Sequence, residues 1–135
     1  MDLSRLLIAS VVGVGLGVLP DWFFFGVLFH EKGRAYPEVW RRWTGGPGEN
    51  LAIALSVLLS FLTFFGFAYL YAAFSPHGWV AAFRMATTVW VAVPLPLLIG
   101  NALFVKTHPA LVFAHSLGWL VKLLVAAVAS AWIVK

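Results

Sequence analysis

Apolar residues form four long runs along this chain, and polar residues gather in the links between them. The runs cover about residues 3–29, 49–74, 79–104 and 109–133. Each has about 20 residues or more, which at ~1.5 Å per residue crosses a hydrocarbon core ~30 Å thick. Because a segment in hydrocarbon must satisfy its own backbone hydrogen bonds, each run predicts a membrane-spanning helix.

Two of the three links are short. They are Ser75-Pro76-His77-Gly78 and Lys106-Thr107-His108, and Pro109 suits the first turn of the helix that follows. Short links make the second, third and fourth helices antiparallel neighbours. The pattern therefore predicts an antiparallel four-helix transmembrane bundle that forms a single domain over residues 1–135.

The link between the first two spans, residues 30–48, is the only long one. Its aromatic and apolar residues recur at i, i+3, i+4 and i+7: Tyr36, Val39, Trp40 and Trp43. This spacing predicts a short amphipathic helix over about residues 36–44, lying in the headgroup layer. The alternative is an ordinary loop whose aromatic residues lie in the interfacial belt. With the helix, the fold class is an all-α membrane protein with an interfacial helix between spans one and two.

Composition agrees with a lipid environment. Hydrophobic residues make up 62% of the 135 residues and charged residues 10%, against about 25% charged in soluble domains. A water-soluble core of this length would leave too much apolar surface exposed. The absence of cysteine excludes disulfides, thiolate metal sites and cysteine nucleophiles. The formal charge is +4, but the basic residues are few and dispersed, so no nucleic-acid partner is expected.

The basic residues predict an orientation. On the side of the long link lie Lys32, Arg34, Arg41, Arg42 and Lys106. On the opposite side lie Arg5, Arg84 and Lys135. The positive-inside rule therefore places the 30–48 link in the cytoplasm and both termini outside.

A few polar residues lie inside the spans at matching depths. Asp21 lies ~10–12 Å from the side of the long link, His115 ~9 Å and Lys122 ~20 Å. His115 and Lys122 share a helix face at i and i+7, and the Lys122 side chain leans back toward the start of its helix. Asn101 and Ser56 reach a similar level. Trp119 lies deep enough to pack in the bundle or to wall a pocket.

Two interpretations of this cluster stay open. In one, Asp21 and Lys122 form a buried pair that pins two helices together, and His115 and Asn101 add interhelical hydrogen bonds. In the other, the cluster lines a pocket that binds or moves a small polar or amphipathic molecule, since an ionisable residue inside a membrane marks a functional site by default. Ligand-binding candidates are Asp21, Asn101, His115, Lys122, Ser56 and Trp119.

Proline predicts a distortion of the helix at two places, and glycine predicts close packing of two helices at a third. Pro20 frees a backbone carbonyl one turn earlier and kinks the helix beside Asp21. Pro94-Leu95-Pro96 removes two helical hydrogen bonds and should bend or locally unwind the third span. Gly13 and Gly17 stand in the GxxxG relation, which allows close approach of another helix within the chain or in a dimer.

No cofactor, metal or catalytic residue is predicted. A metal site built from His30, Glu31 and His108 has no supporting spacing, and a haem would need facing axial histidines where only His115 is buried. A lipid-modifying enzyme using Asp21 or His115 as acid and base is a third possibility, but it lacks a recognisable nucleophile or metal set.

Two stretches resemble an uncharacterised bacterial membrane family, domain of unknown function 1761. One is residues 17–40, with the aromatic cluster Trp22-Phe23-Phe24-Phe25-Gly26; the other is residues 90–132, with Asn101-Ala102-Leu103-Phe104 and Phe113-Ala114-His115-Ser116. The chain departs from the family pattern by lacking a proline after the first aromatic pair and by carrying His115 where an acidic residue is common. The resemblance implies a four-helix protein of a bacterial inner membrane and no particular activity.

The sequence thus predicts a small integral membrane protein that works as a binding or transport module with a polar intramembrane pocket. Four spans make a narrow path, so transport would need a homo-oligomer. The alternative is a structural or accessory subunit whose buried polar residues hold helices together.

Overall fold

The computed structural model describes residues 2–28, 46–105 and 107–134, with only the backbone described at residues 21, 25, 26 and 28. Throughout these residues the regular structure is helical, with no strand. The elements are α1 (Leu3–Asp21), η1 (Trp22–Leu28), α3 (Pro47–Phe74), α4 (Gly78–Ala92), α5 (Pro94–Phe104) and α6 (Pro109–Ile133). The predicted interfacial helix over residues 36–44 lies outside the described residues.

Four helical segments are long and apolar enough to cross a membrane. They are Leu3–Phe24, Pro47–Phe74, Gly78–Phe104 and Pro109–Ile133. These helical segments agree with the second, third and fourth predicted runs to within two residues at either end. For the first span, helix begins at Leu3 as predicted, and η1 continues it to Leu28, the last described residue before the long link.

The short links begin and end helices as their residues predict. Ser75 adopts the left-handed conformation with φ 44°, and its N–H donates to the Tyr71 carbonyl, which ends α3. Gly78 has φ 79°, a value that glycine reaches without steric cost, and it starts α4. At the other short link, the His108 side chain accepts a hydrogen bond from the Ala110 N–H at 3.0 Å and so caps α6. The predicted turn between Ser75 and Gly78 is therefore confirmed, and α6 begins at Pro109 as predicted.

Proline shapes the first and third spans differently. Pro20 lies inside α1 without ending it, and from Trp22 the helix continues with the wider π-helical geometry of η1. Such π segments are frequent at functional sites. In the third span the helix breaks at Val93, whose φ of −125° and ψ of −73° are not helical, and Pro94 starts α5. The predicted disruption at Pro94-Leu95-Pro96 is confirmed as this break.

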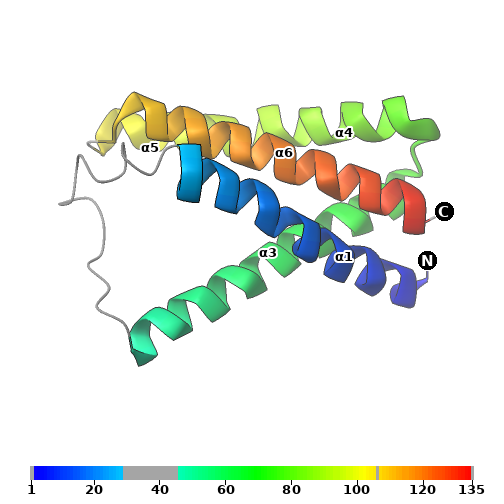
Figure 1. The fold of residues 1–135 in the computed structure, drawn as a ribbon. Coiled ribbons are helices and arrows are strands. Elements are labelled where there is room, and N and C mark those ends of the chain that lie inside the picture. The colour runs from blue at the N-terminus through cyan, green and yellow to red at the C-terminus, as the bar shows by residue number, and fades with distance from the viewer. Residues whose placement is uncertain (1, 29–45, 106, 135) are drawn as a thin grey trace.

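Helix α6 is the central element of the molecule. It contacts α1, α3, α4, α5 and η1, and Figure 1 shows it between α1 on one side and α4–α5 on the other. Its packing face consists largely of small residues, including Ala126, Ala127, Ser130 and Ala131. Small side chains let neighbouring backbones approach closely.

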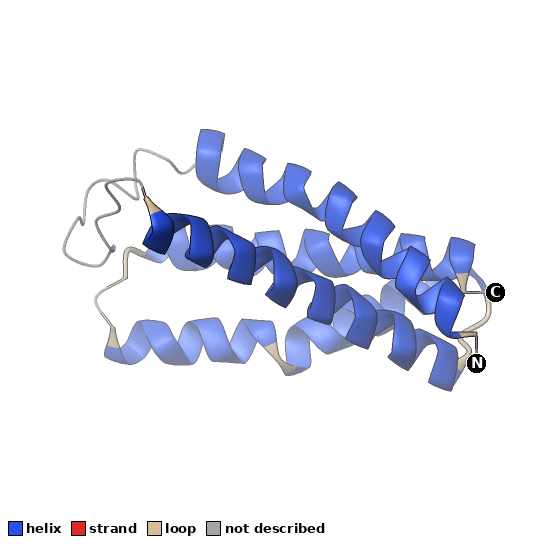
Figure 2. Cartoon of the chain, turned by 90° about the horizontal axis from the view of Figure 1, so that it is seen from below, coloured by secondary structure: helices blue, strands red, loops and turns tan. Residues whose placement is uncertain are grey.

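Both termini lie at the end of the molecule that also holds the 75–77 turn (Figure 1). We call this the termini end, and the opposite end, with residues 28, 46, 105 and 107, the linker end. Near the termini end, α3 packs through Phe64, Phe67, Ala68 and Tyr71. Toward the linker end α3 diverges from α6 (Figure 1), and residues 53–59 are exposed. Figure 2 shows the same helices from below.

The glycine pair of α1 packs against a single side chain of α3. A Cβ at Gly17 would lie 2.8 Å from Cζ of Phe64, and a Cβ at Gly13 would overlap the same ring. Phe64 is 2% exposed, so the ring has little room to move. The close approach predicted from the GxxxG spacing is thus made within the chain, between α1 and α3.

This contact predicts that Gly13→Ala lowers the free energy of unfolding by about 1–3 kcal/mol, the usual cost of overpacking. Gly15→Ala is the matched control, since a Cβ at Gly15 meets nothing within 4 Å. Because alanine is the better helix former, that variant should be unchanged or more stable by up to about 1 kcal/mol. Unfolding by a denaturing detergent in mixed micelles measures the free energy of unfolding of both variants. Equal effects of the two substitutions would contradict the assigned contact.

Candidate functional site

Lys122 is the ionisable side chain nearest the middle of α6. It follows Pro109 by 13 residues and precedes Ile133 by 11, which places its Cα ~20 Å and ~17 Å from the two helix ends at 1.5 Å per residue. The side chain is partly buried. An ammonium at this depth is costly in hydrocarbon and needs polar partners.

Two neutral groups contact the Lys122 ammonium. Its Nζ donates a hydrogen bond to the hydroxyl oxygen of Ser60 on α3 at 3.5 Å. The same Nζ lies 5.5 Å from the centre of the Trp119 ring, one turn earlier on α6, within the range of a cation–π interaction. The cluster of Lys122, Ser60 and Trp119 therefore links α6 to α3 through one cation.

Helix α1 forms the third wall of this cluster. A Cβ at Gly17 would lie 3.9 Å from Cε of Lys122, so the lysine side chain passes close to the α1 backbone there. Asp21 lies four residues beyond Gly17 on α1, on the same helix face one turn closer to the linker end. The backbone of Asp21 is described and its side chain is not.

The other predicted site residues lie in different surroundings. Ser56, one turn before Ser60, is exposed, and its hydroxyl donates to the Ile53 carbonyl at 2.7 Å. Asn101 is exposed on α5. His115 is partly buried on α6, two turns before Lys122. Among the described side chains the structure thus groups Lys122 with Trp119 and leaves Ser56 and Asn101 at the surface.

Ser60 is a contact that the sequence pattern did not predict, because Ser56 was expected at the level of the cluster. Depths counted from the termini end explain the difference. Ser60 lies 14 residues before the end of α3, or ~21 Å, and the Cα of Lys122 lies ~17 Å from the end of α6. A lysine side chain leaning toward the start of its helix spans this difference and stops one turn short of Ser56. Counting both helices from their shared end would have found Ser60.

A second polar contact fixes the break in the third span. The indole Nε1 of Trp90 donates a hydrogen bond to the backbone carbonyl of Ser116 on α6 at 2.8 Å. Trp90 lies four residues before Pro94, in the last turn of α4. Ser116 is a small, buried residue of α6. The bond therefore anchors α4 to α6 beside the break.

Replacing Trp90 by phenylalanine keeps an aromatic ring and removes the indole donor. We expect Trp90→Phe to lower the free energy of unfolding by about 0.5–1.5 kcal/mol, the usual net worth of one hydrogen bond. Trp132→Phe is the control, because the Trp132 side chain is 71% exposed. Detergent-induced unfolding of the two variants gives the comparison, and a Trp90→Phe protein as stable as Trp132→Phe would show that the hydrogen bond contributes nothing.

Acidic and histidine side chains do not gather into a metal site in the part of the chain that the structure describes. No group of three or more such residues is close enough to hold an ion. Of the three residues considered for a metal, His30 and Glu31 lie outside the described residues, and the Nδ1 of His108 is the α6 cap acceptor.

Comparison with known proteins gives a family. The family model described as "Protein of unknown function (DUF1761)" matches residues 7–130. The chain belongs to this family. The match covers every residue of the Lys122 cluster and confirms the resemblance found in the sequence, while the family description assigns no activity. No curated protein matches this DUF1761 chain, and no solved structure matches it.

Proposed function

We propose that this DUF1761 protein is an integral membrane protein whose four helices cross the bilayer as an antiparallel bundle. The apolar surface of the helices supports this proposal. Large hydrophobic side chains are exposed along all four, among them Leu16, Leu59, Val80, Leu97 and Phe113. Exposed apolar surface along every helix is unfavourable in water, whereas lipid covers such surface in a membrane protein.

The orientation that we propose has the termini end outside and the linker end in the cytoplasm, in a bacterial inner membrane. It rests on the positive-inside rule. All five basic residues assigned to the linker end lie in the long link or at residue 106, outside the described residues, whereas Arg5 and Arg84 lie nearer the termini end.

Within this bundle we propose a binding site for a small polar or amphipathic molecule, centred on Lys122. The supporting observation is the ammonium itself, which lies near mid-helix between α1, α3 and α6 with a hydroxyl and an indole ring among its contacts. A cation in such surroundings attracts an anionic group strongly, because the low dielectric of the membrane interior weakens the attraction far less than water does.

Asp21 completes the proposed site. α1 and α6 run in opposite directions, since both termini lie at one end (Figure 1). The Lys122 side chain leans toward the start of its own helix, which is the linker end. Asp21 lies on that side of Gly17, one turn along α1. We propose an Asp21–Lys122 pair that a ligand's anionic group can open by competing for the ammonium.

The divergence of α3 supports access to this site. Ser60 is partly buried, whereas residues 53–59, which continue α3 toward the linker end, are exposed. Lys122 therefore contacts α3 next to its exposed part, and Figure 1 shows α3 diverging from α6 toward the linker end. An amphipathic molecule in the linker-end leaflet would approach between these helices. If it is transported across the membrane, four spans are too few for a path, and a homo-oligomer would be required.

A structural role for the same residues is the second candidate. Among the described residues, every buried side-chain nitrogen or oxygen has a hydrogen-bond partner. Complete satisfaction of this kind is what polar groups that only hold helices together would show. In that case Lys122 pins α6 to α3 and α1, and no ligand is involved.

A ligand-dependent stability experiment separates the two roles. The protein in lipid nanodiscs is mixed with laurate, an amphipathic carboxylate, or with methyl laurate, its neutral ester. Laurate should raise the thermal unfolding midpoint of the wild-type protein by about 5 °C when its concentration far exceeds the dissociation constant. Methyl laurate should not. The rise should be larger in Asp21→Asn, where no carboxylate competes, and absent in a folded Lys122→Met protein.

Other results would favour the structural role. A midpoint that laurate and methyl laurate shift equally, or a laurate response that survives in Lys122→Met, would contradict binding at Lys122. Arg84→Gln is the matched control, since Arg84 is an exposed basic residue of α4 away from the cluster. Its laurate response should equal that of the wild-type protein.

A further inference from the structure

A second polar site lies at the termini end, at the other end of the molecule from the proposed entrance. There the starts of α1 and α4 and the ends of α3 and α6 surround an open cleft of ≈ 780 Å³. Its polar and aromatic lining includes Asp2, Arg5, Tyr71, His77 and Trp79. The cleft falls within the range of about 300–1,000 Å³ that is usual for sites of small molecules.

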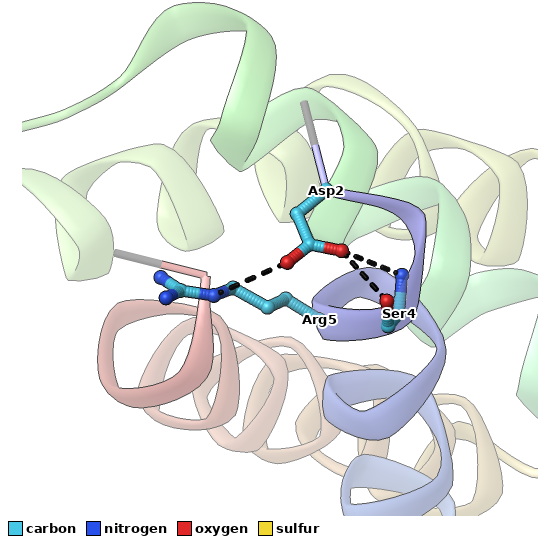
Figure 3. Close-up of polar contacts among 3 residues, drawn as sticks. All are labelled: Asp2, Ser4 and Arg5. Atoms are coloured by element: carbon cyan, nitrogen blue, oxygen red, sulfur yellow. Dashed lines mark hydrogen bonds and ion pairs between the residues drawn. The ribbon is translucent and has the colours of Figure 1, made fainter.

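The cleft holds two opposite charges side by side. Nε of Arg5 lies 3.5 Å from Oδ2 of Asp2, and about half of each side chain is exposed. Figure 3 shows that the other carboxylate oxygen of Asp2 accepts from the hydroxyl and the backbone N–H of Ser4, at 2.8 and 3.0 Å. The hydrogen bond from the Ser4 hydroxyl, and to a smaller extent the one from its backbone N–H, lowers the pKa of Asp2. The carboxylate therefore stays ionised at neutral pH, and the cleft presents one anion and one cation.

This inference rests on the proposed membrane integration, which places the cleft at a membrane surface. Leu3 and Gly78 begin two candidate spans and Ile133 ends another, so in the proposed bundle Asp2, His77 and Val134 lie just outside the hydrocarbon layer. Trp79 is an aromatic residue of the kind found at this boundary. The hydroxyl of Tyr71 donates to the Pro76 carbonyl at 3.3 Å, which fixes the turn that forms one wall. Ala72, Ala131 and Val134 add apolar surface to the cleft.

We propose that this cleft binds the headgroup of a phospholipid that carries both a phosphate and a primary ammonium, the chemistry of phosphatidylethanolamine. The phosphate oxygens would accept from the Arg5 guanidinium, and the ammonium would donate to Asp2. A purely anionic headgroup such as glycerol phosphate would place its charge beside the Asp2 carboxylate. A choline headgroup carries no N–H to donate to that carboxylate. The acyl chains would lie along the apolar side of the cleft.

The proposal is tested by lipid retention in native mass spectrometry of the full chain. Phosphatidylethanolamine, phosphatidylglycerol and phosphatidylcholine with the same acyl chains are added in equal amounts to the protein in detergent. We expect retention of phosphatidylethanolamine about tenfold above the other two, the factor that corresponds to about 1.4 kcal/mol. Equal retention of the three lipids by the wild-type protein would overturn the proposal, and this comparison needs no variant.

Variants then assign the two charges. Asp2→Asn keeps a side chain that caps α1 well and should remove the preference for phosphatidylethanolamine over phosphatidylglycerol. Arg5→Gln should reduce retention of both lipids about tenfold. Arg84→Gln is the matched control, because Arg84 is exposed on α4 and does not line the cleft. Loss of lipid in Arg84→Gln equal to that in Arg5→Gln would also overturn the proposal.

Soluble phosphoethanolamine distinguishes the two sources of the same headgroup. Displacement of the lipid by millimolar phosphoethanolamine would show that the cleft also binds the free headgroup. Retention of the lipid in its presence would show that the acyl chains are needed, and either result supports a headgroup site. Lys122→Met should retain phosphatidylethanolamine as the wild-type protein does, because the Lys122 cluster and the cleft share no residue. A negative result for the headgroup cleft therefore does not contradict the proposed Lys122 site, and a negative result for Lys122 does not contradict the cleft.

Discussion

Replacing Phe64 by alanine should lower the free energy of unfolding by about 3–5 kcal/mol, the cost of removing a buried phenylalanine ring. Phe64 is 2% exposed and fills the space over Gly13 and Gly17 of α1. Its core cluster includes Leu123, Ala126 and Ala127 of α6. Phe64 thus covers the α1 backbone and belongs to a core that α3 shares with α6. Gly13 and Gly17 have no side chain that could fill the cavity.

Detergent-induced unfolding in mixed micelles measures this loss, with Phe74→Ala as the matched control. Phe74 lies on the same helix, but its side chain is 74% exposed, so its removal leaves no cavity. The control should cost less than about 0.5 kcal/mol, as surface substitutions usually do. If Phe64→Ala were no more destabilising than Phe74→Ala, the contact between α1 and α3 would not be what holds the bundle together.

Breaking the proposed Asp21–Lys122 pair should cost almost as much. Asp21→Leu removes the proposed counter-ion of Lys122 at a depth where a buried charge costs about 2.5–3.5 kcal/mol on insertion scales. Lys122→Met leaves the carboxylate unpaired at a similar cost. The double variant Asp21→Leu/Lys122→Met should regain most of the stability, because an apolar pair replaces an ion pair without leaving a charge behind.

The same unfolding measurement on the wild-type protein, both single variants and the double variant gives the coupling energy between the two positions. Additive effects would show that Asp21 and Lys122 do not interact. Arg84→Leu serves as a control for the removal of one charge from an exposed position, and it should not destabilise. This cycle tests the pair under either proposed role, whereas the laurate experiment tests ligand binding.

The helices could be predicted from the sequence because their signals are local. An apolar run of about 20 residues fixes a span through its length and its need for internal hydrogen bonds. Pro94 lacks a backbone N–H, so the break at Val93 follows from the local sequence alone. Ser75 and Gly78 mark the turn between α3 and α4 for an equally local reason. None of these features depends on where another helix lies.

The contacts between helices could be predicted only in part. The glycine spacing of α1 predicted the close approach of another helix, but it did not predict that the Phe64 ring of α3 would pack there. The divergence of α3 carries no sequence signal, since residues 53–59 are as apolar as the buried half of the helix. The cleft at the termini end was missed because Asp2, Arg5 and His77 come from different elements, which only the fold brings together.

Solid-state NMR of the protein in lipid bilayers tests the central claim, the Asp21–Lys122 pair beside Gly17, most directly. The protein carries ¹³C-labelled aspartate and ¹⁵N-labelled lysine, and Asp2→Asn leaves Asp21 as the remaining aspartate. We predict a dipolar coupling between an aspartate carboxyl carbon and a lysine Nζ at about 4 Å, the separation of an ion pair. The coupling should disappear in Lys122→Met. No coupling, or a coupling that survives this substitution, would contradict the account.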